Sequence, residues 1–214
     1  MLTLLILIIL FDGAYSGYKN GLIVQLIRTI GYIIVAYFAL DYYIPLSEFL
    51  YLLIPYPTPF APASNPYLFY EEQYMFSIEL TYYRLISFML LLFIGWILVR
   101  LLSQFINYIV EQFKMPEPFN GIGGAVVGVI VNYVGVFYLL FLTSLIPFNF
   151  VQSPLIDSVA ANFILTSSPV LTEENHTLFV AEVHDEYEAT QPTMEIEPSN
   201  EESNEETAEE NNEE

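Results

Sequence analysis

The sequence predicts an all-α integral membrane protein with about four transmembrane helices, interfacial helices and a disordered acidic C-terminal tail. Of its 214 residues, 55% are hydrophobic, which is more than soluble domains usually carry. Its net charge of −20 arises mainly after residue 172, where sixteen of the 25 acidic residues lie and no Lys or Arg occurs. We therefore expect a membrane domain over residues 1–172 and a disordered tail over residues 173–214.

The first apolar segment covers residues 2–18. Its unbroken apolar part, residues 2–11, would be about 15 Å long as a helix, which is half the thickness of the hydrocarbon layer. The helix can cross the membrane only if it continues through Asp12, which places this carboxylate below the membrane surface. A cleaved signal peptide is the alternative, but no Lys or Arg precedes the run, so we expect an uncleaved helix.

The second segment covers residues 21–44 and is long enough to cross the membrane with some tilt. We expect Pro45 to end it, because proline lacks the backbone N–H that a helix interior requires. Residues 46–80 are rich in proline and aromatic residues, a composition typical of a loop at the membrane interface. Within this stretch, residues 71–80 are predicted to form a short surface helix.

The third segment covers residues 81–103. Arg84 and Arg100 bracket its uncharged part and are about 24 Å apart along a helix, so we expect each guanidinium to reach an opposite membrane surface. Polar residues at helical spacing then predict that the helix continues as an amphipathic piece until Pro116.

The fourth segment covers residues 119–146, and Pro147 is expected to end it. After it, Ser153 resembles an N-cap with Pro154 at the first helical position. Residues 154–164 are therefore predicted to form one interfacial helix that lies on the bilayer.

The distribution of basic residues predicts the orientation in the membrane. Lys19 and Arg28 flank the first short turn, Arg100 and Lys114 flank the connection between the third and fourth segments, and the long loop after Pro45 contains no base. The positive-inside rule places both short turns in the cytoplasm. Both termini then lie outside the cell membrane.

Small residues on the fourth segment mark a candidate helix-packing surface. They share one helix face, at spacings of three or four residues: Gly121, Gly124, Gly128, Asn132 and Gly135. Small residues let membrane helices approach closely, and an Asn adds a hydrogen bond across such a contact. The partner helix could belong to the same chain or to a second copy.

Asp12 and Arg28 are ionisable residues in or near the membrane, where an unpaired charge is costly. They could form an intramembrane ion pair that joins the first two segments, lie near the interface, or contribute to an ion path. We favour a structural role, because one acid and one base do not make a relay.

Several classes of function lack their characteristic residues. The chain has no Cys, and both His residues lie in the tail. It has no P-loop, nucleotide-binding glycine fingerprint or basic patch. We therefore expect no catalysis, cofactor, metal site or nucleic-acid partner.

Three groups of residues resemble the colicin V production protein (CvpA) family of bacterial inner-membrane proteins. The first comprises residues 17–26 (GYKNGLIVQL), followed by residues 31–33 and 42–43. The second comprises residues 121–124 (GIGG) with Gly128, and the third comprises residues 165–171 (LTSSPVL). The resemblance covers about residues 1–172. The chain departs from the family at Phe119 and Asn120, where members often have an Asp-Arg pair.

The resemblance implies a multi-pass cell-membrane protein needed for the production of a peptide toxin (bacteriocin) or for envelope homeostasis. We expect it to act by contacts within the lipid bilayer, with other membrane proteins or a second copy of itself. A small oligomeric channel or transporter component is the alternative. The scarcity of polar residues within the predicted spans favours the first hypothesis.

Overall fold

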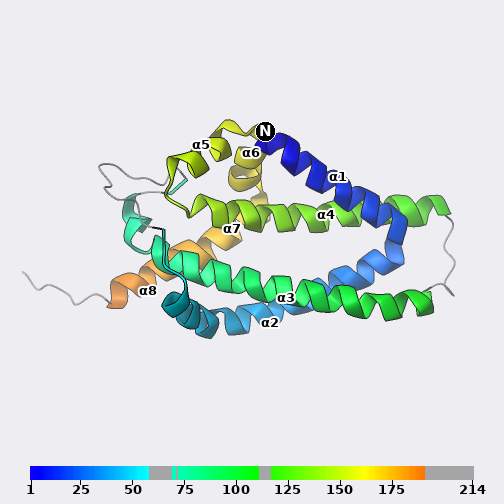
Figure 1. The fold of residues 1–214 in the computed structure, drawn as a ribbon, viewed down its shortest axis with the longest axis horizontal. Helices are drawn as coiled ribbons and strands as arrows, with labels where there is room; N and C mark the ends of the chain where they lie inside the picture. The colour runs from blue at the N-terminus through cyan, green and yellow to red at the C-terminus, as the bar shows by residue number, and fades with distance from the viewer. Residues whose placement is uncertain (58–68, 71, 111–116, 191–214) are drawn as a thin grey trace, which may run out of the picture.

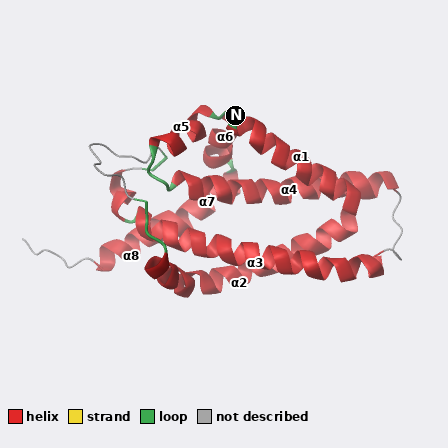
Figure 2. Cartoon of the chain, in the orientation of Figure 1, coloured by secondary structure: helices red, strands yellow, loops and turns green. Residues whose placement is uncertain are grey.

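The computed structural model describes residues 1–57, 69–70, 72–110 and 117–190, and the regular elements in this part of the chain are all helices (Figure 1, Figure 2). In chain order they are α1 (Leu2–Asn20), α2 (Leu22–Leu53), η1 (Glu72–Phe76), α3 (Ile78–Val110), α4 (Glu117–Ser144), α5 (Asn149–Asp157), α6 (Val159–Ser167), α7 (Pro169–His176), η2 (Thr177–Ala181) and α8 (Glu182–Thr190). Prolines 59, 62, 66 and 116, Lys114 and residues 191–214 lie outside the described residues.

Four of these helices are long and apolar enough to cross a membrane, which confirms the predicted spans. They are α1, α2, α3 over residues 78–105, and α4 over residues 119–144. Large apolar side chains cover their outer faces, and Ile33, Tyr37 and Phe93 are each more than half exposed. A hydrocarbon solvent accommodates these side chains, so the protein is a multi-pass membrane protein in contact with the lipid bilayer.

The four long helices form two antiparallel pairs, α1 with α4 and α2 with α3 (Figure 1). Gly21 alone separates α1 from α2, and the two helices diverge from this sharp turn. Helix α6 packs against α1, where Thr3 Oγ1 lies 2.9 Å from Ser158 Oγ, and α5 packs against α4 and α6. At the end opposite the Gly21 turn, α7, η2 and α8 pack between the two pairs (Figure 1).

The prediction that Pro45 ends the second helix is wrong, because α2 continues to Leu53 with Pro45 in its interior. Membrane helices tolerate proline where nearby groups satisfy the freed backbone. The carbonyl that Pro45 leaves without its helical donor is that of Asp41, four residues earlier, and both residues lie on an exposed part of α2. The predicted interface loop is therefore shorter than expected at its beginning.

The predicted helix over residues 154–164 is also wrong. Pro154 lies inside α5, and a break at Ser158 separates α5 from α6. Ser158 is the N-cap, since its hydroxyl oxygen accepts the backbone N–H of Ala161 at 3.2 Å. The structure also extends beyond the predicted domain boundary at residue 172, because residues 173–190 are helical and bury Phe179, Val180 and Val183 completely.

Candidate functional site

The small-residue face of α4 packs directly against α1 of the same chain. An ideal Cβ atom built on Gly124 or Gly128 would lie within 3.0 Å of the α1 backbone, at Gly17 and Gly13 respectively. Real Cβ atoms essentially never approach other atoms so closely. The two helix backbones are therefore in contact, and only glycine fits at this crossing.

Two asparagines of α4 extend this contact by hydrogen bonds. Asn132 Nδ2 donates to the carbonyl oxygen of Ile9 in α1 over 2.7 Å. At the other end, the backbone N–H of Leu22 donates to Asn120 Oδ1 over 2.7 Å, so Asn120 satisfies a free donor in the first turn of α2. Asn120, one of the two residues where the sequence departs from the CvpA pattern, thus has a structural role here.

Two further members of the predicted face behave differently. Gly121 contacts α1, since an ideal Cβ atom there would lie 2.6 Å from the Tyr18 ring. Gly135 is exposed and has nothing within 4 Å of its ideal Cβ position. The structure therefore does not place Gly135 in the helix contact, which ends one turn earlier at Asn132.

Sequence reasoning did not identify the α1 side of this contact. Gly13, Gly17 and Gly21 are spaced by four residues and meet Gly128, Gly124 and Asn120. Their regular spacing is the signal that could have revealed them. The same device recurs between α2 and α3, where Gly31 faces Val99 and Gly95 faces Val35.

The structure does not form the predicted ion pair between Asp12 and Arg28. Asp12 is exposed on α1. Arg28 Nε donates instead to Ser103 Oγ on α3 over 3.0 Å. The hydrogen bond thus joins α2 to α3, because these helices pair with each other while α1 and α2 diverge from Gly21.

Side chains satisfy the backbone where α4 ends. Gln152 Nε2 donates to the carbonyl oxygens of Ser144 and Ile146, over 2.7 and 2.8 Å. Tyr56 donates to the Leu145 carbonyl oxygen over 2.9 Å. These carbonyls lack partners within the helix, so such contacts hold its end in place. Tyr70 Oη lies 2.8 Å from Ser144 Oγ, and burial raises the pKa of the Tyr70 phenol, which stays neutral.

Arg84, which the sequence predicts to reach a membrane surface, is covered by α8. Arg84 is 5% exposed, and its Nη2 donates a hydrogen bond to Glu186 Oε2 of α8 over 2.6 Å. Arg100, at the other end of α3, is exposed, with its guanidinium carbon 5.2 Å from the centroid of the Trp96 ring.

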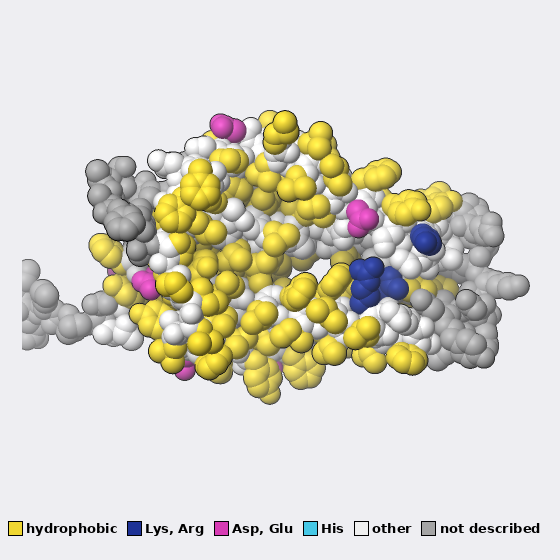
Figure 3. All heavy atoms as spheres, viewed as in Figure 1, with side chains coloured by type: hydrophobic (Ala, Val, Ile, Leu, Met, Phe, Trp, Pro, Cys, Tyr) yellow, Lys and Arg dark blue, Asp and Glu magenta, His cyan; other side chains and the backbone are white. Residues whose placement is uncertain are grey.

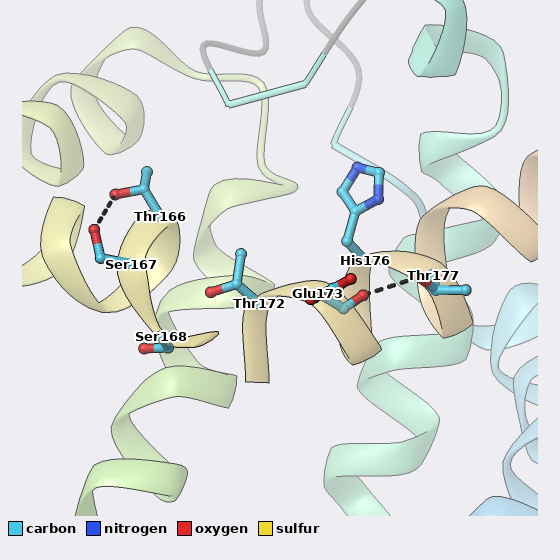
Figure 4. Close-up of a pocket in the computed structure, with 7 residues that line it drawn as sticks. All are labelled: Thr166, Ser167, Ser168, Thr172, Glu173, His176 and Thr177. Atoms are coloured by element: carbon cyan, nitrogen blue, oxygen red, sulfur yellow. Dashed lines mark hydrogen bonds between the residues drawn. The ribbon is translucent and has the colours of Figure 1, made fainter. Parts of the chain in front are cut away.

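A hollow of about 520 Å³ lies where α6 meets α7. Hydroxyl side chains and two titratable residues line it: Thr166, Ser167, Ser168, Thr172, Glu173, His176 and Thr177. Figure 4 shows Thr166 and Ser167 turned toward each other and the His176 ring directed away from them. These side chains do not converge on a common point, and no metal-binding cluster of His, Asp or Glu occurs among the described residues.

The sequence model of the colicin V production protein family matches residues 2–169. This chain belongs to that family. A curated relative from Bacillus subtilis (strain 168), the uncharacterized transmembrane protein YshB, is 32% identical over 172 residues, which cover 80% of this chain and 93% of the relative. No solved structure matches the chain.

The colicin V production family match includes the four spans, both glycine contacts, α5 and α6. It ends at the first residue of α7. The segment formed by α7, η2 and α8, which we term the C-terminal segment (169–190), therefore lies almost wholly outside the family match.

Proposed function

We propose that the protein is a non-catalytic accessory factor of the bacterial cell membrane, needed for production of a peptide toxin or for homeostasis of the envelope. Membership of the colicin V production family carries this proposal. The described contacts support it, because the polar side chains between the long helices join one helix to another. We propose that its partners are other membrane proteins or a second copy.

The surface available for such partners is apolar and broad. The glycine contact between α1 and α4 is used within the chain, so partners would meet other helix faces. Large apolar side chains cover the visible face over all four long helices (Figure 3). Contacts between membrane proteins depend on packing of such faces, since lipid tails are as apolar as leucine.

A gene deletion in a strain that secretes a peptide toxin tests this role. We expect active toxin in the medium to fall while toxin mRNA stays constant, and the wild-type gene to restore secretion. Cross-linking in native membranes should then capture a component of the toxin-producing or envelope machinery. Unchanged secretion together with an unchanged envelope, measured by sensitivity to detergents, would contradict the proposal.

A small channel or transporter component is the second candidate, and one observation favours it. The visible face is hollowed between the two helix pairs, and Lys and Arg side chains gather beside this hollow (Figure 3). The described basic residues toward that end of the molecule are Lys19, Arg28 and Arg100. Purified protein in liposomes would be assayed for anion flux, and flux that falls in Arg28→Gln would favour the channel over the accessory role.

A further inference from the structure

The N-terminal end of α3 carries a buried polar face. Ser77, Thr81 and Arg84 are four and three residues apart, which places them on one side of the helix. Their exposed fractions are 0%, 0% and 5%. A polar face buried this deeply needs partners, because an unsatisfied donor away from water costs free energy.

The C-terminal segment covers this polar face. Glu186 of α8 accepts the hydrogen bond from Arg84, and His184 Nδ1 lies 3.3 Å from Ser77 Oγ. His184 is further placed by Tyr74, whose ring contacts it edge-on at a centroid distance of 5.1 Å. The two ends of the polar face are thus both occupied by side chains of one helix.

Donors on this face remain unused. Arg84 Nε and Thr81 Oγ1 are buried and have no hydrogen-bond partner. The fork of a guanidinium matches the two oxygens of a carboxylate, and a neighbouring hydroxyl can donate to the same group. Glu186 accepts through Oε2 alone, from Arg84 Nη2 alone. The polar face thus has donors suited to a carboxylate, and the Glu186 carboxylate satisfies only one of them.

An aromatic anchor lies next to the polar face. Phe179 of η2 is fully buried and contacts one ring from each of three long helices. The centroid distances are 5.5 Å to Tyr43 of α2, 5.3 Å to Phe88 of α3 and 6.4 Å to Phe141 of α4. Phe179 therefore fills the space between the two helix pairs, seven residues before Glu186.

We propose that Arg84 and Thr81 form a carboxylate-binding site, and that the C-terminal segment occupies it as an internal ligand that an acidic peptide helix can displace. The competing peptide carries a large apolar side chain seven residues before its carboxylate. This proposal goes beyond the role in toxin production and stands without it.

Three observations support displacement of the C-terminal segment. The Glu186 side chain is 55% exposed, so water and a competing carboxylate can reach the ion pair. The family match ends at residue 169, so the segment lies almost wholly outside the part of the chain that matches the family. Finally, η2 is a single π-helical turn. Such turns are rare in proteins as a whole, and those that occur are frequently found at functional sites.

Binding of a synthetic peptide tests the site in the full-length protein. The probe is a fluorescent peptide of residues 169–190, titrated against wild type, Glu186→Gln and Glu188→Gln in detergent micelles. Glu186→Gln weakens the internal ligand, so we expect it to bind the peptide about tenfold more tightly than wild type does. Glu188→Gln is the matched control, because Glu188 lies on the same helix but pairs with His184, and it should behave as wild type.

Substitution within the peptide itself supplies a second test. A peptide with Glu186→Gln should bind the Glu186→Gln protein about tenfold more weakly than the native peptide, and addition of Arg84→Gln to the protein should remove this difference. Equal binding of the two peptides would overturn the carboxylate site. If the native peptide binds wild type and the Glu186→Gln protein equally, or binds neither, the proposal that a peptide displaces the C-terminal segment is overturned.

Discussion

Gly21 makes the turn that separates α1 from α2. Among the described residues it is the one with a positive φ, at 82° with ψ at 163°. Only glycine occupies this region readily, because a Cβ atom would clash with the backbone. An ideal Cβ atom there would also lie 2.5 Å from Asn120 Nδ2, the side chain that caps α2. One residue thus fixes the divergence of the two helices.

The substitution Gly21→Ala should lower the free energy of unfolding by about 1–3 kcal/mol. Thermal unfolding of the purified protein in detergent measures the change. Gly135→Ala is the control, because Gly135 lies in a helix with nothing within 4 Å of its ideal Cβ position. That variant should match wild type or gain up to about 1 kcal/mol from better helix propensity. Equal losses in both variants would contradict the argument.

Asn132 contributes a hydrogen bond within the α1–α4 contact. The substitution Asn132→Leu keeps much of the side-chain volume but removes the donor to the Ile9 carbonyl oxygen. Hydrogen bonds between membrane helices contribute about 0.6 kcal/mol on average, so a loss of that order is expected in the same unfolding assay. Thr143→Ala removes an exposed bond within α4 and should have no measurable effect. A stabilised Asn132→Leu variant would show that the bond contributes nothing.

At the scale of whole helices, the sequence indicated the packing face of α4 but not its partner. Spacing shows which side of a helix is small, and Gly124 and Gly128 are on that side. Spacing cannot show which other helix approaches, since this depends on how the chain turns at Gly21. Gly135 shares the spacing yet lies beyond the crossing, because two inclined helices touch over a limited length.

Helix boundaries were the least predictable feature of the elements. Pro45 would end a helix in water, but in α2 the surroundings favour continued backbone hydrogen bonding. Ser153-Pro154 has the residue types of a helix start, yet Ser158 performs that role. In both places the observed boundary therefore differs from the one that local residue preferences predict.

Larger side chains on the contact face of α4 should force α1 away. Gly124→Leu or Gly128→Leu should destabilise the protein by about 1–3 kcal/mol, which is typical of overpacking. Val126→Leu and Ile130→Leu are matched controls on α4, because both side chains are more than half exposed. Since the contact lies within one chain, oligomer size measured by light scattering should stay constant. A change in oligomer size for the glycine variants alone would instead place the face between protomers.

At the scale of the molecule, the C-terminal segment was the feature most hidden from sequence analysis. Its acidic composition predicts disorder when averaged over the tail. Phe179 and Glu186 gain their partners only from helices distant in the sequence, such as Phe88 and Arg84 of α3. Composition indicates how much apolar surface a segment could bury by itself. This segment is buried because it packs between the two helix pairs.

The charge distribution over the whole molecule argues for one orientation in the membrane. Of the described basic residues, Lys19, Arg28 and Arg100 lie toward the end with the Gly21 turn, and Figure 3 shows Lys and Arg gathered at that end of the visible face. Arg84, toward the opposite end, is neutralised by Glu186. On the positive-inside rule we propose that the Gly21 turn lies in the cytoplasm and that both termini lie outside.

Single-cysteine labelling checks this orientation, because the chain contains no Cys of its own. Ser167→Cys, exposed at the end of α6, should react with a membrane-impermeant maleimide in whole cells. Lys19→Cys, exposed beside the Gly21 turn, should react only after the membrane is permeabilised. Ser64 lies outside the described residues, between α2 and α3 in the sequence, and we expect Ser64→Cys to follow Ser167→Cys if this orientation holds. The reverse labelling pattern would invert the topology and place the carboxylate site around Arg84 on the cytoplasmic side.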